Sequence, residues 1–192
     1  QREVIYGQRR SVLMGEDIRQ AIGDMLDSAV GNLADSYCPE ELSAGEWDLE
    51  ALNLALANLI PQAYFAPIAA EDLKKKNVKA AKELLLERAR SAYEKKSAEL
   101  EGEGLDMREI ERVVLLREVD SKWMEHIDNM DQLRDGIGLR AYGQIDPVVA
   151  YQKEGFDMFD EMIAAIQQGT VQMLFRVTVK SKVERVQTMQ PQ

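Results

Sequence analysis

The chain has few of the residues that build redox and metal sites. Cys38 is the single cysteine and His126 the single histidine among 192 residues. One cysteine excludes an internal disulfide framework and a cysteine-based zinc site, and one histidine leaves no histidine cluster for a metal. We therefore expect no metal or other cofactor in this chain.

Long apolar runs, strand patterns and a leader sequence are also missing. No apolar run approaches the roughly 18–20 residues of a membrane span, and the start does not have the pattern of a signal peptide. β-branched residues are dense only in the short stretch 175–179. Because the chain opens in mid-pattern without a Met start, we expect it to be a piece cut from a longer protein.

Positive charge is in deficit. The chain has 24 Lys and Arg against 34 Asp and Glu, which gives a net charge of -10. Such an excess of negative charge argues against nucleic acid as a main partner. Hydrophobic residues make up 45% of the chain, which is enough for one or two small domains with their own cores.

Helical periodicity is what the sequence has in abundance, above all in residues 108–177. Two apolar stripes repeat at steps of three, four or seven on either side of a break at 138–145. The first contains Ile110, Val113, Leu116, Trp123, Ile127, Met130, Leu133 and Ile137; the second contains Val148, Tyr151, Phe159, Met162, Ile163, Ile166, Thr170 and Leu174. Two helices of about thirty residues with a short loop predict an antiparallel hairpin with arms roughly 45 Å long.

The ends of these two helices have recognisable signals. Asp146 followed by Pro147 is typical of a helix start, because Asp caps the helix and Pro needs no donor at the first position. Gly136-x-Gly138 follows a helix rather than a strand, and no Gly-x-x-x-x-Gly-Lys-Ser/Thr loop is present. We interpret these glycines as helix terminators rather than as a phosphate-binding loop.

The preceding hundred residues also predict helices, in a smaller unit. They are expected over residues 2–14, 17–37 and 49–59 and from Ala70 onward, until Gly102-Glu103-Gly104 interrupts the pattern. The Lys/Glu mixture of the last of these, which includes Lys96, indicates a solvated face. The expected fold is all-α, with a long antiparallel two-helix hairpin and a smaller helical domain.

Two groups of hairpin residues could be read as functional. Glu125 and His126, together with Asp120 and Asp128, could form an acid–base or metal cluster. However, His126 and Asp120 would lie on different faces of a helix, and no second histidine supports a metal, so we interpret His126 as packed or facing a partner. Trp123, Met124, Ile127 and Met130 could form an apolar surface, but their spacing favours the core of the hairpin.

The loop between the two helices presents Leu139, Arg140, Tyr142 and Gln144, with Arg134 nearby. Tyr142 lies between Ala141 and Gly143, where little surrounding chain can bury it. A rigid aromatic face with a hydroxyl group suits contact with an extended peptide or a partner groove. The residues alone do not decide between this contact and an ordinary loop tyrosine that folds back on its own hairpin.

Several motifs of the sequence resemble those of a known family. Residues 120–126 (DSKWMEH), 130–144 (MDQLRDGIGLRAYGQ), 146–147 and 156–159 resemble the C-terminal part of SecA, the bacterial preprotein translocase ATPase. Residues 1–10 are similar to the end of its long scaffold helix, and 37–39 and 47–49 to signposts of its helical wing domain. The resemblance extends to about residue 178.

The resemblance implies a division and a role. Residues 1–15 would end the scaffold helix, 16–104 would form the helical wing, 105–178 the two-helix finger, and 179–192 a tail or linker. In this family the finger lies at the cytoplasmic mouth of the SecY channel and couples the ATP-driven motor to an unfolded preprotein. The loop tyrosine that contacts the polypeptide would be Tyr142. The implied partners are the preprotein, the SecYEG channel and the motor domains, at the inner face of the cell membrane.

The parts of that family that bind cofactors are not in this sequence. The nucleotide-binding domains lie upstream, so ATP and magnesium are expected only in the full-length protein, and this chain should not hydrolyse ATP alone. The family's frequent C-terminal zinc cluster is also missing. Two other readings remain: a stand-alone helical peptide-binding adaptor or holdase without a motor, and a helical enzyme that uses Glu125 and His126.

Overall fold

The computed structural model describes residues 1–15, 17–43, 45–74, 76–138 and 146–178, and in these ranges every regular element is a helix. The seven helices are α1 (Arg2–Leu13), α2 (Arg19–Tyr37), α3 (Leu49–Leu59), α4 (Ala70–Leu73), α5 (Val78–Gly102), α6 (Met107–Gly136) and α7 (Pro147–Arg176). The all-α prediction is therefore confirmed. None of the described helices combines the length and the hydropathy that a membrane span needs.

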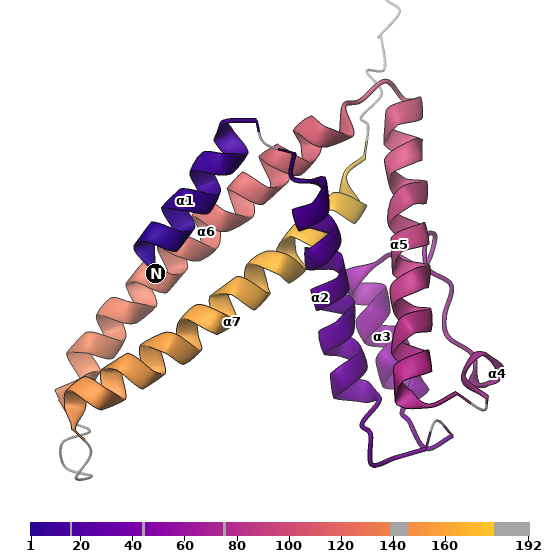
Figure 1. The fold of residues 1–192 in the computed structure, drawn as a ribbon, viewed down its shortest axis with the longest axis horizontal. Helices are drawn as coiled ribbons and strands as arrows, with labels where there is room; N and C mark the ends of the chain where they lie inside the picture. Colours follow the sequence, from indigo (N-terminus) through magenta and orange to yellow (C-terminus); the bar gives the residue numbers. More distant parts are fainter. Residues whose placement is uncertain (16, 44, 75, 139–145, 179–192) are drawn as a thin grey trace, which may run out of the picture.

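The helices form two groups that meet at one end of a long hairpin (Figure 1). Helices α6 and α7, together called the hairpin below, run antiparallel, and α1 lies along α6. Helices α2, α3 and α5 pack together around the C-terminal end of α7. The hairpin therefore projects away from a compact helical base.

Two apolar clusters hold these groups together. One lies among α2, α3 and α5 and takes in Val171 and Phe175 from α7. The other joins α1, α6 and α7 with the first turns of α2 and the last turn of α5. Met25 and Tyr93 pack against both clusters. The predicted division at residue 104 stays a prediction, and side chains pack across it.

Short polar side chains set the helix boundaries. Asp146 accepts a hydrogen bond from the Val148 amide at 2.8 Å with Pro147 at the first position, as predicted. Asp106 accepts one from the Arg108 amide at 2.9 Å and starts α6. Gly104 has a φ of +83°, a left-handed conformation that glycine adopts without strain, so the break between α5 and α6 is also confirmed.

The helix predicted from Ala70 onward is in fact two helices. The short α4 ends at Leu73, and Asn77 begins α5 by accepting a hydrogen bond from the Ala80 amide at 2.8 Å. The solvated face predicted for α5 is wrong at Lys96, which is 1% exposed. Its ammonium group lies 5.0 Å from the centre of the Tyr64 ring and donates to the Tyr64 hydroxyl at 3.0 Å.

The predicted apolar stripes are partly out of phase. Val113 and Val148 are each 63% exposed, and Met124, which was expected in the core of the hairpin, is 69% exposed. The buried face of α6 instead consists of Met107, Glu111, Val114, Leu115, Val119, Trp123 and His126. Two of these buried residues, Glu111 and His126, are polar. A prediction based on apolar residues alone therefore assigns the buried face to the neighbouring side of the helix. On α7 the line Met162, Ile166, Thr170 and Leu174 is buried as predicted.

Candidate functional site

Of the predicted contact residues, the structure describes Arg134. Leu139, Arg140, Tyr142 and Gln144 lie outside the residues that the structure describes. Arg134 lies in the last turn of α6, where its guanidinium is 3.2 Å from Asp131 and 3.6 Å from Asp135. Its side chain is 64% exposed, so Arg134 can reach a partner near the loop. The negative charges of Asp131 and Asp135 partly offset its positive charge.

The two arms approach each other closely at two glycines of α7. A Cβ atom on Gly155 would lie 2.8 Å from Cε of Met130, and one on Gly169 would lie 2.4 Å from a carboxylate oxygen of Glu118. Side chains of α6 therefore occupy the space that a larger residue on α7 would need. The two helices therefore approach each other closely at these two points.

His126 lies inside the hairpin rather than at a catalytic surface. It is 4% exposed and lies between the rings of Trp123 and Phe159, at centroid distances of 5.5 and 5.8 Å. Burial lowers the pKa of its imidazole. The interpretation of His126 as a packed histidine is confirmed.

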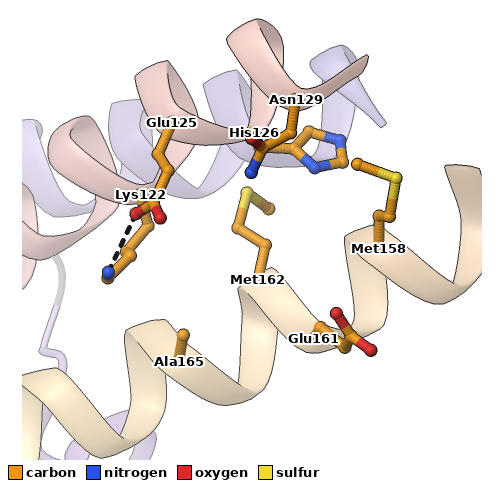
Figure 2. A pocket seen from close by; sticks show the side chains of 8 residues that line it. All are labelled: Lys122, Glu125, His126, Asn129, Met158, Glu161, Met162 and Ala165. Carbon is orange, nitrogen blue, oxygen red and sulfur yellow. Dashed lines mark hydrogen bonds and ion pairs between the residues drawn. The ribbon is translucent and has the colours of Figure 1, made fainter. Parts of the chain in front are cut away.

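A cavity of about 220 Å³ opens beside His126 between the two arms (Figure 2). Its polar lining includes Asn129, Glu161 and the pair Lys122–Glu125, whose charged atoms are 3.0 Å apart. Glu125 is therefore engaged with a lysine of its own helix. Among the described residues no three Asp, Glu, His or Cys side chains come together as a metal site. The arrangement gives no support to the reading as an enzyme.

Polar and aromatic contacts attach helix α1, and Gln1 just before it, to the hairpin. The Gln1 side chain donates to the Gly155 carbonyl on α7 at 2.9 Å, and its Oε1 lies 3.2 Å from Nε2 of His126 on α6. Arg9 pairs with both carboxylate oxygens of Asp120, at 2.8 and 3.2 Å. Tyr6 packs edge-on against Trp123 with the ring centres 6.2 Å apart. A displacement of α1 would therefore carry the hairpin with it.

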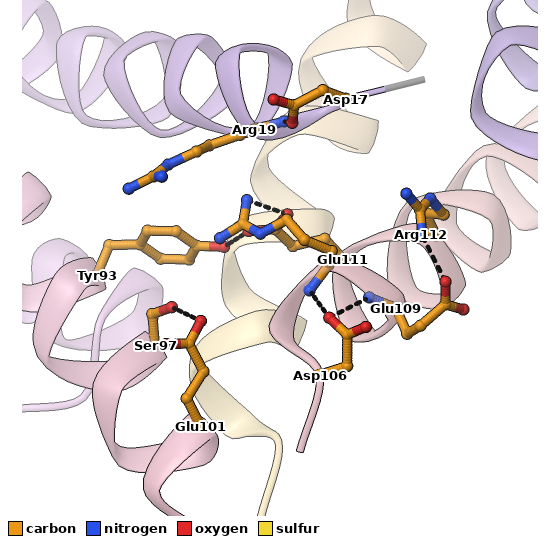
Figure 3. A network of polar contacts seen from close by, with 10 residues as sticks. Asp17, Arg19, Tyr93, Ser97, Glu101, Asp106, Glu109, Glu111 and Arg112 are labelled. Atoms are coloured by element: carbon orange, nitrogen blue, oxygen red, sulfur yellow. Dashed lines mark hydrogen bonds and ion pairs between the residues drawn. The ribbon is translucent and has the colours of Figure 1, made fainter. Parts of the chain in front are cut away.

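A buried carboxylate, Glu111, fixes the base of the hairpin to α5 (Figure 3). Its side chain is 0% exposed; one carboxylate oxygen accepts from the Tyr93 hydroxyl and the other lies 2.6 Å from Nη1 of Arg108. Burial raises the pKa of Glu111, while the Tyr93 hydrogen bond and the charge of Arg108 act in the opposite direction. Burial and the nearby carboxylate also raise the pKa of Tyr93.

The sequence analysis did not identify Glu111, Tyr93 or Lys96 as functional or buried residues. A signal for Glu111 was present, because it lies four residues after Met107 and four before Leu115, in phase with the buried face. The same signal marks Lys96, which lies four residues after Ala92 and four before Leu100, in phase with the buried face of α5.

Comparison with known proteins assigns the family. The family described as the SecA wing and scaffold domain matches residues 1–178. Proteins named protein translocase subunit SecA are 48% identical over 97% of the chain in Desulforamulus reducens and 48% identical over 93% of it in Carboxydothermus hydrogenoformans. A SecA 1 from Alkaliphilus metalliredigens is 45% identical over 100% of the chain. The chain spans 20–21% of the length of these relatives. The resemblance noted in the sequence is thereby confirmed, and the chain belongs to the SecA wing and scaffold family.

Proposed function

We propose that this chain is the wing and scaffold part of a SecA protein translocase and that the hairpin is its stiff arm. The observation that carries the proposal is the family match, which runs without interruption from α1 to the end of α7. The named relatives are protein translocase subunits, so the process is movement of a polypeptide. In this proposal α1 is the end of a longer scaffold helix that brings motion from motor domains elsewhere in the protein.

The packing explains why the hairpin can act as an arm. Each large apolar side chain buried between the helices contributes about 1.5–3 kcal/mol before ordering costs. Such side chains include Met162, Ile166 and Leu174, and they extend over much of α7. Because the arms are packed along their length and α1 is attached to both, a movement at the base would reach the loop with little loss.

The loop would make the contact with the translocating chain. Tyr142 offers an aromatic face and a hydroxyl, and Arg134 and Arg140 offer donors, with Leu139 and Gln144 beside them. Such groups bind many peptides weakly without reading their sequence, as a sliding substrate requires. The partners in this proposal are an unfolded preprotein, the SecYEG channel and the motor domains, at the cytoplasmic face of the cell membrane.

Nucleotide chemistry belongs elsewhere in the full-length protein. A phosphate-binding loop needs a strand, a glycine-rich turn and a helix in sequence, and the described residues contain no strand. ATP therefore does not fit these residues. We place ATP and magnesium in segments outside this chain, and we expect no ATP hydrolysis by the chain alone.

Site-specific photocrosslinking tests the contact directly. A photoreactive amino acid replaces Tyr142 in a full-length translocase that contains this chain, and a preprotein is arrested during transport. We expect a crosslink to the preprotein that depends on ATP and on the channel. The matched control places the same group at Phe156, an exposed aromatic residue of α7 that is 62% exposed. Equal crosslinking at both positions, or none at position 142, would contradict the proposal.

A further inference from the structure

One side chain of α5, Tyr93, touches both arms of the hairpin. Its hydroxyl donates to Glu111 on α6, and its ring packs edge-on against Phe175 on α7, with ring centres 5.9 Å apart at 77°. Glu111 is 0% exposed and Phe175 is 2% exposed, and Tyr93 itself is partly buried. The positions of α6 and α7 are thus both defined relative to the same residue.

Both carboxylate oxygens of Glu111 have hydrogen-bond partners. Each carboxylate oxygen of Glu111 has one partner, the Tyr93 hydroxyl or the Arg108 guanidinium. Two charged residues at the start of α2 also act on this carboxylate: Arg19 lowers its pKa and Asp17 raises it. A buried carboxylate that loses a partner is costly, so the arrangement strongly favours one geometry.

Backbone hydrogen bonds hold the turn between α5 and α6: the Gly104 amide donates to the Glu101 carbonyl at 3.0 Å and the Leu105 amide donates to the Leu100 carbonyl at 3.1 Å. The helices are joined by residues 103–106, which include Gly104 with its left-handed φ. From this turn the two helices diverge (Figure 1). Side-chain contacts close to the turn act on the angle together with these backbone bonds, and the Tyr93–Glu111 contact crosses between the two helices there.

We propose that Tyr93 is a positioning residue that sets the angle at which the hairpin leaves α5, through its hydroxyl on Glu111 and its ring on Phe175. Small changes at this point are amplified along the arm. Residue 128 lies about 25 Å along α6 from residue 111, so a tilt of about 10° moves it by roughly 4 Å. The consequence for translocation rests on the function proposed above; the angle itself does not.

Pulsed electron paramagnetic resonance on the full 192-residue chain measures this angle. Spin labels at Glu87 on α5 and Asp128 on α6, both exposed positions, report the distance between helices in a Cys38→Ala background. We expect Tyr93→Phe, which keeps the ring and loses the hydroxyl, to shift or broaden that distance by several ångströms. A second label pair at Asp128 and Asp157 should stay unchanged, because it lies within the hairpin.

Three further variants separate positioning from general loosening. Glu111→Gln still accepts the Tyr93 hydrogen bond and should keep the distance closer to wild type than Glu111→Leu does. Arg90→Gln removes an exposed pair between α5 and Asp27 of α2 and should leave the distance unchanged. Circular dichroism checks that each variant is folded.

Two results would overturn the proposal. One is an unchanged Glu87–Asp128 distance in folded Tyr93→Phe and Glu111→Leu; the other is an equal shift in Arg90→Gln. If the distance shifts but a full-length translocase with Tyr93→Phe transports preprotein normally, the result counts against the proposed function and not against the role of Tyr93.

Discussion

The Oε1 atom of Gln1 lies 3.2 Å from Nε2 of His126, and the same Gln1 amide donates to Gly155 on the opposite arm. Three helices thus meet at one amide group. Because that oxygen can only accept, His126 must carry its proton on Nε2. The histidine is therefore a structural donor in its neutral form.

The first prediction concerns the pH dependence of stability. Burial holds the pKa of His126 below its unfolded value, so the unfolded chain takes up a proton first as the pH falls. Protonation of the unfolded chain lowers the free energy of unfolding from about pH 6.5 downward. The loss is complete once the pH is below the pKa of His126 in the folded chain. Urea unfolding of wild type and His126→Phe at about pH 8 and pH 5.5 should show a smaller loss for the variant. An identical loss in both proteins would exclude the effect.

The same site predicts a packing cost. His126→Ala removes a ring that lies between Trp123 and Phe159 and should lower the free energy of unfolding by about 2–4 kcal/mol. Glu125→Ala next to it changes an exposed side chain and should cost less than about 0.5 kcal/mol. Chemical denaturation measures both.

Close packing of the arms gives a third prediction. Gly155→Leu would collide with the end of the Met130 side chain and should cost about 1–3 kcal/mol, because Met130 must repack between the arms. Met130→Ala in the same chain should recover part of that loss. The control is Gly7→Ala in α1, which meets nothing within 4 Å and should stabilise the chain by about 0.5–1 kcal/mol. A tolerated leucine at 155 would show that the arms are not closely packed there.

Two neighbouring lysines of α5 form a natural pair for a fourth prediction. Lys96 is 1% exposed and donates to the Tyr64 hydroxyl, so Lys96→Ala should cost about 2–3 kcal/mol through lost packing and a lost buried hydrogen bond. Lys95 is exposed and makes one 3.2 Å contact to the Ala63 carbonyl. Lys95→Ala should cost less than about 0.5 kcal/mol. Thermal unfolding with both variants side by side tests the difference.

The sequence was sufficient for the hairpin and its ends, because Asp146, Pro147 and Gly136 are local signals that need no tertiary context. It was insufficient for the buried face of α6. Glu111 and His126 are polar residues whose burial depends on partners far along the chain, Tyr93 and Gln1. The exposure of Met124 has the same origin, because the buried face of α6 contains Trp123, the residue before it, and not Met124.

The site was predicted unevenly for a similar reason. Tyr142 and its neighbours were identified by their place in a loop and by resemblance, and these residues, Arg134 apart, lie outside the described part of the chain. The contacts of α1 with Gly155, His126 and Asp120 could not be predicted, since they join residues more than a hundred positions apart.

In the proposed function, movement of the hairpin displaces a polypeptide that contacts Tyr142. The most direct measurement is preprotein transported per ATP hydrolysed by a full-length translocase with Tyr142→Ala. The account predicts that transport falls while nucleotide binding is kept, and that Tyr142→Phe retains more transport than Tyr142→Ala. Normal transport per ATP in Tyr142→Ala would contradict it.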